Sequence, residues 1–287
     1  MSATPLEQAA PVTKTAFVFP GQGSQKAGML AELAEQFASI RETFAEASEA
    51  VGFDLWQIAQ TGEGLDQTEF TQPVLLTASI ALWRVWLESG GVAPKYLAGH
   101  SLGEYSALVA SGALSLGDAA KLVNLRGKLM QTAVPQGVGA MAAILGLDDA
   151  KVIELCAQAT AAGEGSVEAA NYNAQGQVVV AGNKDRVEAV MALAKENGGK
   201  AIALPVSVPS HCSLMKPAAE QFAPALEQTA IELPRIPVLQ NVGAQAATNV
   251  DELRQALTAQ LYESVQWTKT LQFLQDEGVE YLSLIHI

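Results

Sequence analysis

The sequence is poor in cysteine and histidine. Its 287 residues include two cysteines and three histidines. Cys156 and Cys212 are too few for a disulfide framework and form no CxxC metal pair, so we expect a reducing, cytoplasmic location and no metal or other cofactor. With three histidines, any mechanism that depends on imidazole has few residues to choose from.

Basic residues are also scarce. Lys and Arg number 17 against 30 Asp and Glu, which gives a formal net charge of −13. Proteins that bind nucleic acid present clustered basic side chains, whereas those of this chain are scattered singly, so no nucleic-acid partner is expected. The most apolar stretch, residues 75–87, contains Arg84 and is too short to cross a bilayer. The N-terminus lacks a secretory signal pattern, so no membrane partner is expected either.

Apolar residues, in contrast, are abundant. They make up 49% of the chain while only 16% is charged, which indicates a globular protein with a large core. The length fits one large domain, or one large and one small domain. Residues 1–14 lack periodicity and are expected to form a mobile tail, with ordered structure beginning at Thr15.

Strands and helices alternate after this tail. Residues 16–19 form an apolar run that ends at Pro20, typical of a strand buried on both faces of a parallel sheet. A short strand is expected at 96–98, and helical patterns cover residues 28–37, 41–51, 72–88, 104–111 and 118–131. This alternation predicts an α/β fold.

The order of elements changes from Gly139 onward. Strand, helix, strand, strand, helix and strand are expected in turn, at residues 140–145, 148–161, 167–172, 177–181, 184–197 and 201–206. This order is that of the ferredoxin-like unit, so we predict a small inserted domain at residues 138–205. The large domain then comprises residues 15–137 and 206–287, and its second part has expected elements near residues 214–229, 237–240, 251–262, 267–277 and 279–284.

Residues 99–103, Gly-His-Ser-Leu-Gly, match the G-x-S-x-G pattern. A short apolar strand precedes them and a helix follows, which is the setting of a nucleophile elbow. Such a turn holds the serine hydroxyl clear of the sheet, beside the positive end of the helix. Ser101 is therefore the candidate nucleophile. The alternative is a chance Gly/Ser turn, which the flanking strand and helix disfavour.

A serine hydroxyl needs a base to take its proton, and imidazole is the usual one. His100 is adjacent to Ser101, so its side chain leaves the turn in another direction, and His286 lies at the extreme C-terminus. His211, in a loop before a helix, is the remaining candidate. Its alternative role is a loop histidine that hydrogen-bonds the backbone. Cys212 lacks the position for a thiol nucleophile and is interpreted as a packing residue.

Two further features suggest how a substrate is held. A Gly-rich loop at residues 21–25 follows the first strand, so Gln22 and the backbone amide of Leu102 are candidates for an oxyanion hole. The loop is no phosphate loop, because no Gly-Lys-Ser/Thr follows it. Arg126 has apolar neighbours at helical spacing and needs an anion. That anion is either an internal Asp or Glu or a substrate carboxylate, which the planar guanidinium suits.

Taken together, these segments resemble the malonyl-CoA:acyl carrier protein transacylase family of bacterial fatty-acid synthesis. The resemblance rests on residues 19–25 (Phe-Pro-Gly-Gln-Gly-Ser-Gln), 99–105 (Gly-His-Ser-Leu-Gly-Glu-Tyr), Arg126 and 209–211 (Pro-Ser-His), and it spans residues 15–282. It implies an α/β-hydrolase-like large domain with a parallel sheet and a ferredoxin-like insert. It also implies an acyltransferase that moves malonyl from malonyl-CoA to the phosphopantetheine thiol of holo acyl carrier protein.

The resemblance also implies a role for each site residue. Ser101 is expected to be malonylated, His211 to be the base and Arg126 to hold the malonyl carboxylate. Gln22 and the Leu102 amide are again the oxyanion hole. The residues implied by the resemblance alone are the main-chain carbonyl of Gln260, which orients the histidine, and Met130 and Asn173, which line the acyl pocket.

Three other functions remain open at this stage. A serine esterase or thioesterase would pass the acyl group to water, a non-catalytic domain would only bind carrier proteins, and an acyltransferase domain of a polyketide synthase would select a larger acyl group. The chain also departs from the family after Leu282, where a Gly-Pro-Gly turn and a closing helix are expected but Ser-Leu-Ile-His-Ile stands instead. We therefore expect a truncated or replaced C-terminus, which would expose apolar surface.

Overall fold

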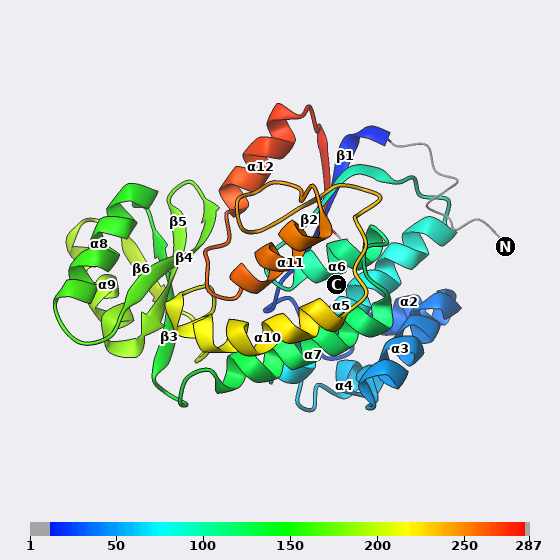
Figure 1. The fold of residues 1–287 in the computed structure, drawn as a ribbon, viewed down its shortest axis with the longest axis horizontal. Helices are drawn as coiled ribbons and strands as arrows, with labels where there is room; N and C mark the ends of the chain where they lie inside the picture. The colour runs from blue at the N-terminus through cyan, green and yellow to red at the C-terminus, as the bar shows by residue number, and fades with distance from the viewer. Residues whose placement is uncertain (1–11, 285–287) are drawn as a thin grey trace.

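The computed structural model describes residues 12–284. Two β-sheets lie side by side, each with its own helices, and the smaller sheet occupies the left of the molecule in Figure 1. The first strand begins at Val12, so the predicted tail 1–14 is wrong at residues 12–14, which belong to that strand. Residues 1–11 of that tail lie outside the described part.

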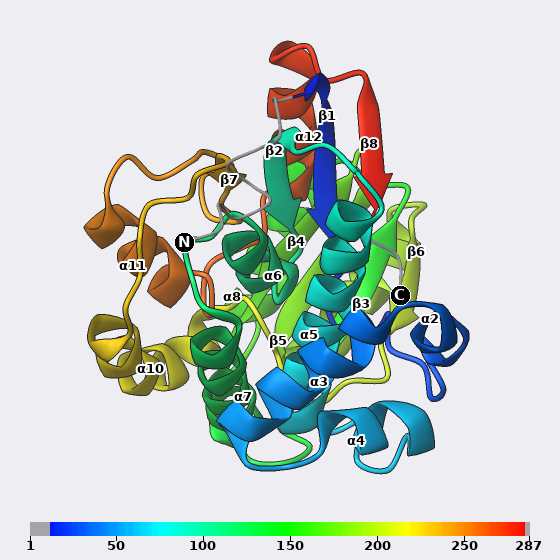
Figure 2. The ribbon, with the colours of Figure 1, turned by 90° about the vertical axis from the view of Figure 1, so that its right-hand side faces the viewer.

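The large sheet has four parallel strands in the order β7-β2-β1-β8. These strands are β1 (Val12–Phe19), β2 (Pro94–Gly99), β7 (Val238–Leu239) and β8 (Tyr281–Leu284). Figure 2 shows β1 between β2 and β8. Phe19 pairs with Gly99 in this sheet, so the loops that follow β1 and β2 leave the same edge side by side.

The helices of the large part agree with the predicted ones within a few residues, and one was not predicted. The helix α4 has only seven residues, but it carries ordinary end signals, because Asp54 caps its first turn and Gly62 ends it with a positive φ of 76°. The full set is α2 (Ala31–Gln36), α3 (Ala38–Val51), α4 (Leu55–Thr61), α5 (Thr68–Glu88), α6 (Gly103–Ala110), α7 (Leu116–Thr132), the 3-10 helix η1 (Ser213–Met215), α10 (Lys216–Gln228), α11 (Val250–Ala259) and α12 (Trp267–Asp276).

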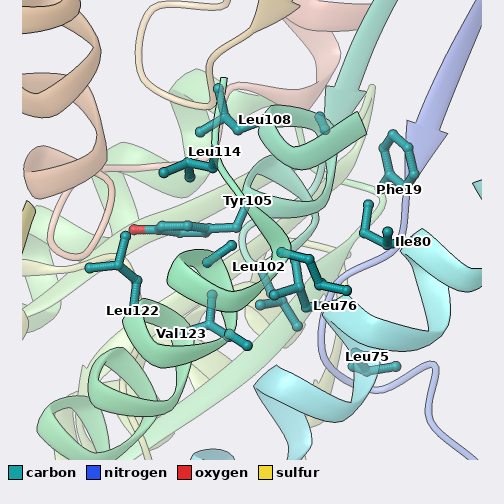
Figure 3. Close-up of a cluster of buried hydrophobic side chains, with 14 of the residues drawn as sticks. Phe19, Leu75, Leu76, Ile80, Leu102, Tyr105, Leu108, Leu114, Leu122 and Val123 are labelled. Carbon is teal, nitrogen blue, oxygen red and sulfur yellow. The ribbon is translucent and has the colours of Figure 1, made fainter. Parts of the chain in front are cut away.

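The helix α6 lies at the centre of the large core. Almost every residue of α6 is buried, as expected for a helix that is apolar on most sides. Leu102, Tyr105 and Leu108 pack among side chains of α5 and α7, including Leu76 and Val123 (Figure 3). The backbone at the start of α6 is therefore enclosed by packing from several directions.

The small sheet is antiparallel, in the order β4-β5-β3-β6. Its elements follow each other as β3 (Gly139–Leu145), α8 (Asp149–Ala161), β4 (Val167–Ala174), β5 (Gln177–Asn183), α9 (Lys184–Glu196) and β6 (Lys200–Ala203). This is the ferredoxin-like arrangement that the sequence predicts. The last strand ends at Ala203 rather than at Val206. The large parallel sheet and this insert together confirm the predicted α/β class.

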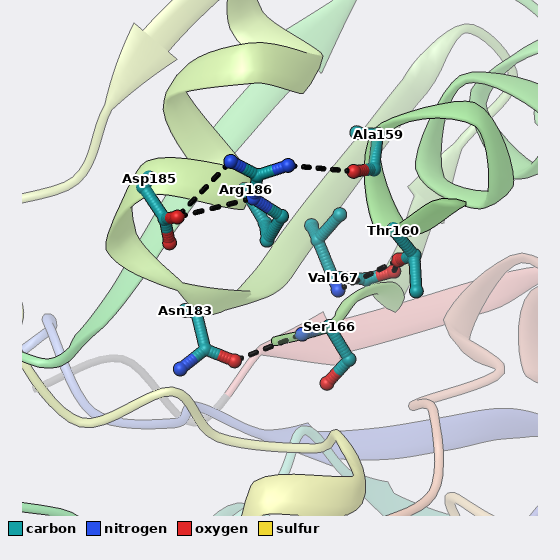
Figure 4. A network of polar contacts seen from close by, with 7 residues as sticks. All are labelled: Ala159, Thr160, Ser166, Val167, Asn183, Asp185 and Arg186. Carbon is teal, nitrogen blue, oxygen red and sulfur yellow. Dashed lines mark hydrogen bonds and ion pairs between the residues drawn. The ribbon is translucent and has the colours of Figure 1, made fainter. Parts of the chain in front are cut away.

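Polar contacts connect α8 to α9 and to β4, and join the residue before β4 to the end of β5 (Figure 4). Arg186, near the start of α9, donates to the carbonyl of Ala159 at 3.1 Å, close to the end of α8. The amide of Ser166 donates to the Asn183 side chain at 2.9 Å, and Thr160 accepts from the next amide along the chain. These bonds fix the edge of the small sheet that faces the large part.

The two sheets are joined through β4. The amide of Tyr172 donates to the carbonyl of Val265 at 3.0 Å, and the amide of Val265 donates to Ala170 at 2.9 Å. Thr268 adds a third bond, to the carbonyl of Tyr172. An edge strand of the small sheet thus continues its pairing onto a segment of the large part, which fixes the small sheet against the large part.

Within residues 12–284, no helix combines the length and apolarity needed to traverse a lipid bilayer.

Candidate active site

Ser101 stands in the sharp turn between β2 and α6, with a positive φ of 52°. The flanking glycines allow this turn. A Cβ on Gly99 would lie 1.9 Å from the carbonyl carbon of Gly103, and one on Gly103 would lie 2.2 Å from the carbonyl oxygen of Phe19. The turn is therefore built where only hydrogen fits at both glycines. The left-handed backbone of Ser101 is strained and must be held by its surroundings.

His211 lies against Ser101. Its Nε2 is 2.9 Å from the Ser101 hydroxyl, and its Nδ1 is 2.7 Å from the main-chain carbonyl of Gln260. A carbonyl only accepts, so Nδ1 carries the hydrogen and Nε2 is left to accept the serine proton. The His211 backbone also has a positive φ of 62°, and its amide is held by the carbonyl of Leu261.

Burial keeps this imidazole neutral. Burial and then the nearby Arg126 charge lower the pKa of His211 to about 3. A pKa below the usual 6.5 means that the ring is unprotonated at neutral pH, which is the form that can act as a base.

The other histidines differ from His211 in their positions. His100 turns away from Ser101 and pairs with the side chain of Asn173 at 2.8 Å, with its ring 5.5 Å from that of Trp267. Burial lowers the pKa of His100 as well. His286 lies outside the described residues. Of the two described histidines, only His211 is in contact with the Ser101 hydroxyl.

Arg126 is the third residue at this point. It is buried on α7, and its guanidinium donates to Ser101 Oγ at 3.1 Å, to Gln260 Oε1 at 3.0 Å and to Gln72 Oε1 at 2.9 Å. The ring of Tyr105 lies 5.7 Å away. Among the described residues, Arg126 forms no ion pair with a carboxylate, so the alternative of a direct internal ion pair is not what the structure contains.

Two buried polar residues of this site were not predicted, Glu104 and Asn241. The Asn241 side chain accepts from the Ser101 amide and donates to the Gly99 carbonyl, both at 2.6 Å, and so spans the strained turn. Glu104 Oε2 accepts from the Asn241 amide at 2.9 Å and from the Gln260 side chain at 2.8 Å. Burial raises the pKa of Glu104 to about 7, against these bonds and the Arg126 charge.

The loop that carries His211 is also held by the small sheet. Glu168 of β4 accepts from the amide of Ser213 at 3.2 Å and from its hydroxyl. Cys212, between His211 and Ser213 in the chain, is fully buried and donates its thiol hydrogen to the carbonyl of Pro209. Burial raises the pKa of this thiol to about 12. Its position and its protonated thiol agree with the predicted packing role.

These side chains open onto a cavity of about 430 Å³ between the two sheets. Most of the predicted residues line it from the large part, whereas Asn173, Met141 and Val179 line it from the small sheet. The backbone amides of Gln22 and Leu102 donate no hydrogen bond to other described residues, which leaves both available to a ligand. The predicted residues in the cavity wall are Gln22, Ser101, Leu102, Arg126, Met130, Asn173 and His211.

Comparisons with known proteins agree with this geometry. The family model for the acyl transferase domain matches residues 16–281. The malonyl CoA-acyl carrier protein transacylase of Escherichia coli K12 is 54% identical over 275 residues, which cover 94% of this chain and 88% of the relative. A crystal structure of FabD from Acinetobacter baumannii is 78% identical with a TM-score of 0.93, covering 94% of this chain and 86% of that one.

A complex of a type II PKS acyl-carrier protein with its malonyl-transacylase is also similar, at 49% identity and a TM-score of 0.92 over 95% of this chain and 89% of that one. The family model spans most of the chain, and the relatives cover nearly all of it at high identity. The chain therefore belongs to the acyl transferase family, within its malonyl CoA-acyl carrier protein transacylase group.

Proposed function

We propose that this chain transfers the malonyl group of malonyl-CoA to the phosphopantetheine thiol of holo acyl carrier protein, through a malonyl ester of Ser101. The observation that carries the proposal is a buried guanidinium, that of Arg126, 3.1 Å from a serine hydroxyl that is itself 2.9 Å from a neutral imidazole. A nucleophile, and in the same cavity a cation that forms no ion pair with any described carboxylate, fit an acyl group that ends in a carboxylate.

In the first half-reaction, His211 Nε2 takes the proton of Ser101 as Oγ attacks the thioester carbonyl carbon. The negative oxygen of the tetrahedral intermediate accepts from the amides of Gln22 and Leu102. The carbon–sulfur bond then breaks, and the coenzyme A sulfur takes the proton from His211. The Gln260 carbonyl holds the imidazole in the required tautomer throughout, at 2.7 Å from Nδ1.

The second half-reaction runs these steps in reverse. The carrier-protein thiol gives its proton to His211 and attacks the malonyl ester, and Ser101 Oγ leaves and recovers that proton. The name of the similar complex, a carrier protein with its malonyl-transacylase, supports a carrier protein as the acceptor. Two free, buried thiols, Cys156 and Cys212, support the proposed cytoplasmic location.

Arg126 supplies the selectivity in this scheme. A malonyl carboxylate pairs with its guanidinium, whereas an acetyl group leaves the buried charge without an anion. Met130 and Asn173, in the cavity wall, are proposed to shape the space around the acyl group. A hydrolase remains the alternative, because a similar Ser–His pair would also pass the acyl group to water.

Intact mass spectrometry after mixing the protein with malonyl-CoA tests this function directly. The wild type is expected to gain one malonyl group, and Ser101→Ala to gain none, with transfer reduced about 10³-fold or more. Adding holo acyl carrier protein should discharge the adduct onto its thiol. Free malonate released faster than the carrier protein is charged would support a hydrolase instead. An adduct that persists in Ser101→Ala would place the nucleophile elsewhere.

A further inference from the structure

Three buried polar side chains lie behind the site, and the proposed mechanism uses none of them directly. They belong to Glu104, Asn241 and Gln260, which are at most 2% exposed. Polar groups buried this completely are costly to desolvate unless they are hydrogen-bonded. Their contacts therefore indicate what they hold in place.

Gln260 touches all three residues of the site. Its side-chain oxygen accepts from Arg126 at 3.0 Å, its side-chain nitrogen donates to the carbonyl of Ser101 at 3.0 Å, and its main-chain carbonyl holds His211. The fourth contact, 2.8 Å long, is the bond from the same side-chain nitrogen to Oε2 of Glu104.

The orientation of the Gln260 amide follows from these partners. If the amide were reversed, its nitrogen would face the Arg126 donors, and its oxygen would face the Ser101 carbonyl and the Glu104 carboxylate. The first contact would set donor against donor, and the others acceptor against acceptor. Glu104 penalises the reversed orientation when its carboxylate is ionised, because it then only accepts.

We propose that Glu104 is a positioning residue for acyl selection: by holding the Gln260 side chain, it keeps an oxygen on Arg126 and so directs the guanidinium at the acyl carboxylate. This inference rests on the proposed function, since it concerns how that site distinguishes malonyl from acetyl. Glu104 forms no hydrogen bond with the reacting atoms or with Arg126, and the Gln260 amide is its hydrogen-bonded route to Arg126. Its other bond, from the Asn241 amide, leads to the Ser101 turn, whose disturbance would slow malonyl and acetyl transfer alike.

The contacts of Glu104 also define the matched variants. Its Oε2 makes both bonds, whereas Oε1 has no hydrogen-bond partner within residues 12–284. Glu104→Gln retains an accepting oxygen of the same reach, and Glu104→Leu removes it at similar volume. Ser106→Ala is the control on the same helix, because the buried Ser106 hydroxyl has no hydrogen-bond partner in the described part of the chain.

The test measures acyl-enzyme formation from malonyl-CoA and from acetyl-CoA in the wild type and each variant. In Glu104→Leu, kcat/KM for malonyl-CoA should fall about tenfold or more, mainly through KM, while that for acetyl-CoA changes less than about threefold. Glu104→Gln and Ser106→Ala should keep the malonyl-to-acetyl ratio within about threefold of the wild type. In an Arg126→Ala background, Glu104→Leu should cause no further loss of malonyl transfer.

Gln260→Leu provides a second route if Glu104→Leu does not fold, as judged by circular dichroism. This substitution removes the side-chain amide of Gln260 but keeps its main-chain carbonyl. It should lower the malonyl-to-acetyl ratio about as much as is expected for Glu104→Leu. An unchanged ratio in the Leu variants, an equal loss for both acyl groups, or a Glu104→Gln that behaves like Glu104→Leu would each overturn the inference. A wild type that forms no malonyl adduct would instead overturn the proposed function, so the two failures are distinguishable.

Discussion

The two parts of the molecule bury different kinds of side chain. The core between the small sheet and its helices is apolar, built around Ile144, Val152, Leu155, Val178 and Val180. The large part has an apolar core as well, but it also buries polar and charged side chains where β2 ends, namely Glu104, Arg126, His211, Asn241 and Gln260. Buried polar groups cost free energy that apolar groups do not. The difference indicates that the large part carries the chemistry and the small sheet serves as a wall of the cavity.

The largest expected effect concerns the buried cation of the large part. Arg126→Ala should lower kcat/KM for malonyl transfer about 100-fold, because a hydrogen-bonded charge pair with the acyl carboxylate is lost. Acetyl transfer, which offers no carboxylate, should change far less. Both rates are measured as acyl-enzyme formation by intact mass. Equal losses for the two substrates would mean that Arg126 only supports the structure.

The buried acid of the large part should make stability depend on pH. The folded-state pKa of Glu104 is raised from 4.5 to about 7, so its contribution to stability is fully present below pH 4.5 and is lost as the pH rises through 7. Glu104→Gln does not titrate. Its free energy of unfolding relative to the wild type should therefore rise by roughly 1–3 kcal/mol between pH 4.5 and pH 8.5.

Urea denaturation of both proteins at each pH measures this difference, because titrations common to both proteins cancel. The pKa of His211 is lowered and acts in the opposite sense, reducing stability as the pH falls below 6.5 in both proteins. A difference between the two proteins that does not vary with pH would show that Glu104 titrates normally.

The apolar wall should respond in stability rather than in chemistry. Val180→Ala removes two methyl groups from the small core, where Val180 is fully buried. We expect the free energy of unfolding to fall by about 1–2 kcal/mol. Transfer by the protein that remains folded should keep its rate and its preference for malonyl. A change in that preference would mean that the wall also selects the acyl group.

The smallest effect is expected where the small sheet holds the catalytic loop. Glu168→Ala removes the acceptor of the Ser213 amide and hydroxyl, two residues after His211. We expect kcat to fall about fivefold with KM nearly constant, because the base is held less well while the substrate contacts remain. Glu188→Ala, which removes a carboxylate at an exposed position of α9, is a control elsewhere in the small part. An unchanged kcat in Glu168→Ala would mean that the small sheet encloses the cavity but does not position the catalytic loop.

Local signals in the sequence were enough to predict the elbow and the insert. The glycines around Ser101, the strand before it and the helix after it are neighbours in the chain, and so are the elements of the small sheet. Elimination among three histidines selected His211, which the structure places beside Ser101. The resemblance, rather than any spacing, pointed to the Gln260 carbonyl.

The polar residues behind the site could not be predicted in this way. Glu104 looks like an ordinary acid in the first turn of a helix, where carboxylates are favoured on the surface too. Asn241 follows a strand of two residues and has no motif around it. The two hydrogen-bond partners of Glu104, Asn241 and Gln260, lie 137 and 156 positions away from it in the chain. Such bonds depend on how the fold brings distant segments together, which no local pattern encodes.

The strand order of the small sheet has a practical consequence. The chain enters through β3 and leaves through β6, and these two strands are neighbours, with Ala142 opposite Ala203. The covalent connection of this unit to the rest of the protein thus consists of two adjacent stems, beside the hydrogen bonds that β4 makes to the large part. Chimeras between relatives can place both crossover points at these stems and so exchange one wall of the cavity as a single segment. The catalytic serine, its base and the arginine then all come from the same parent protein.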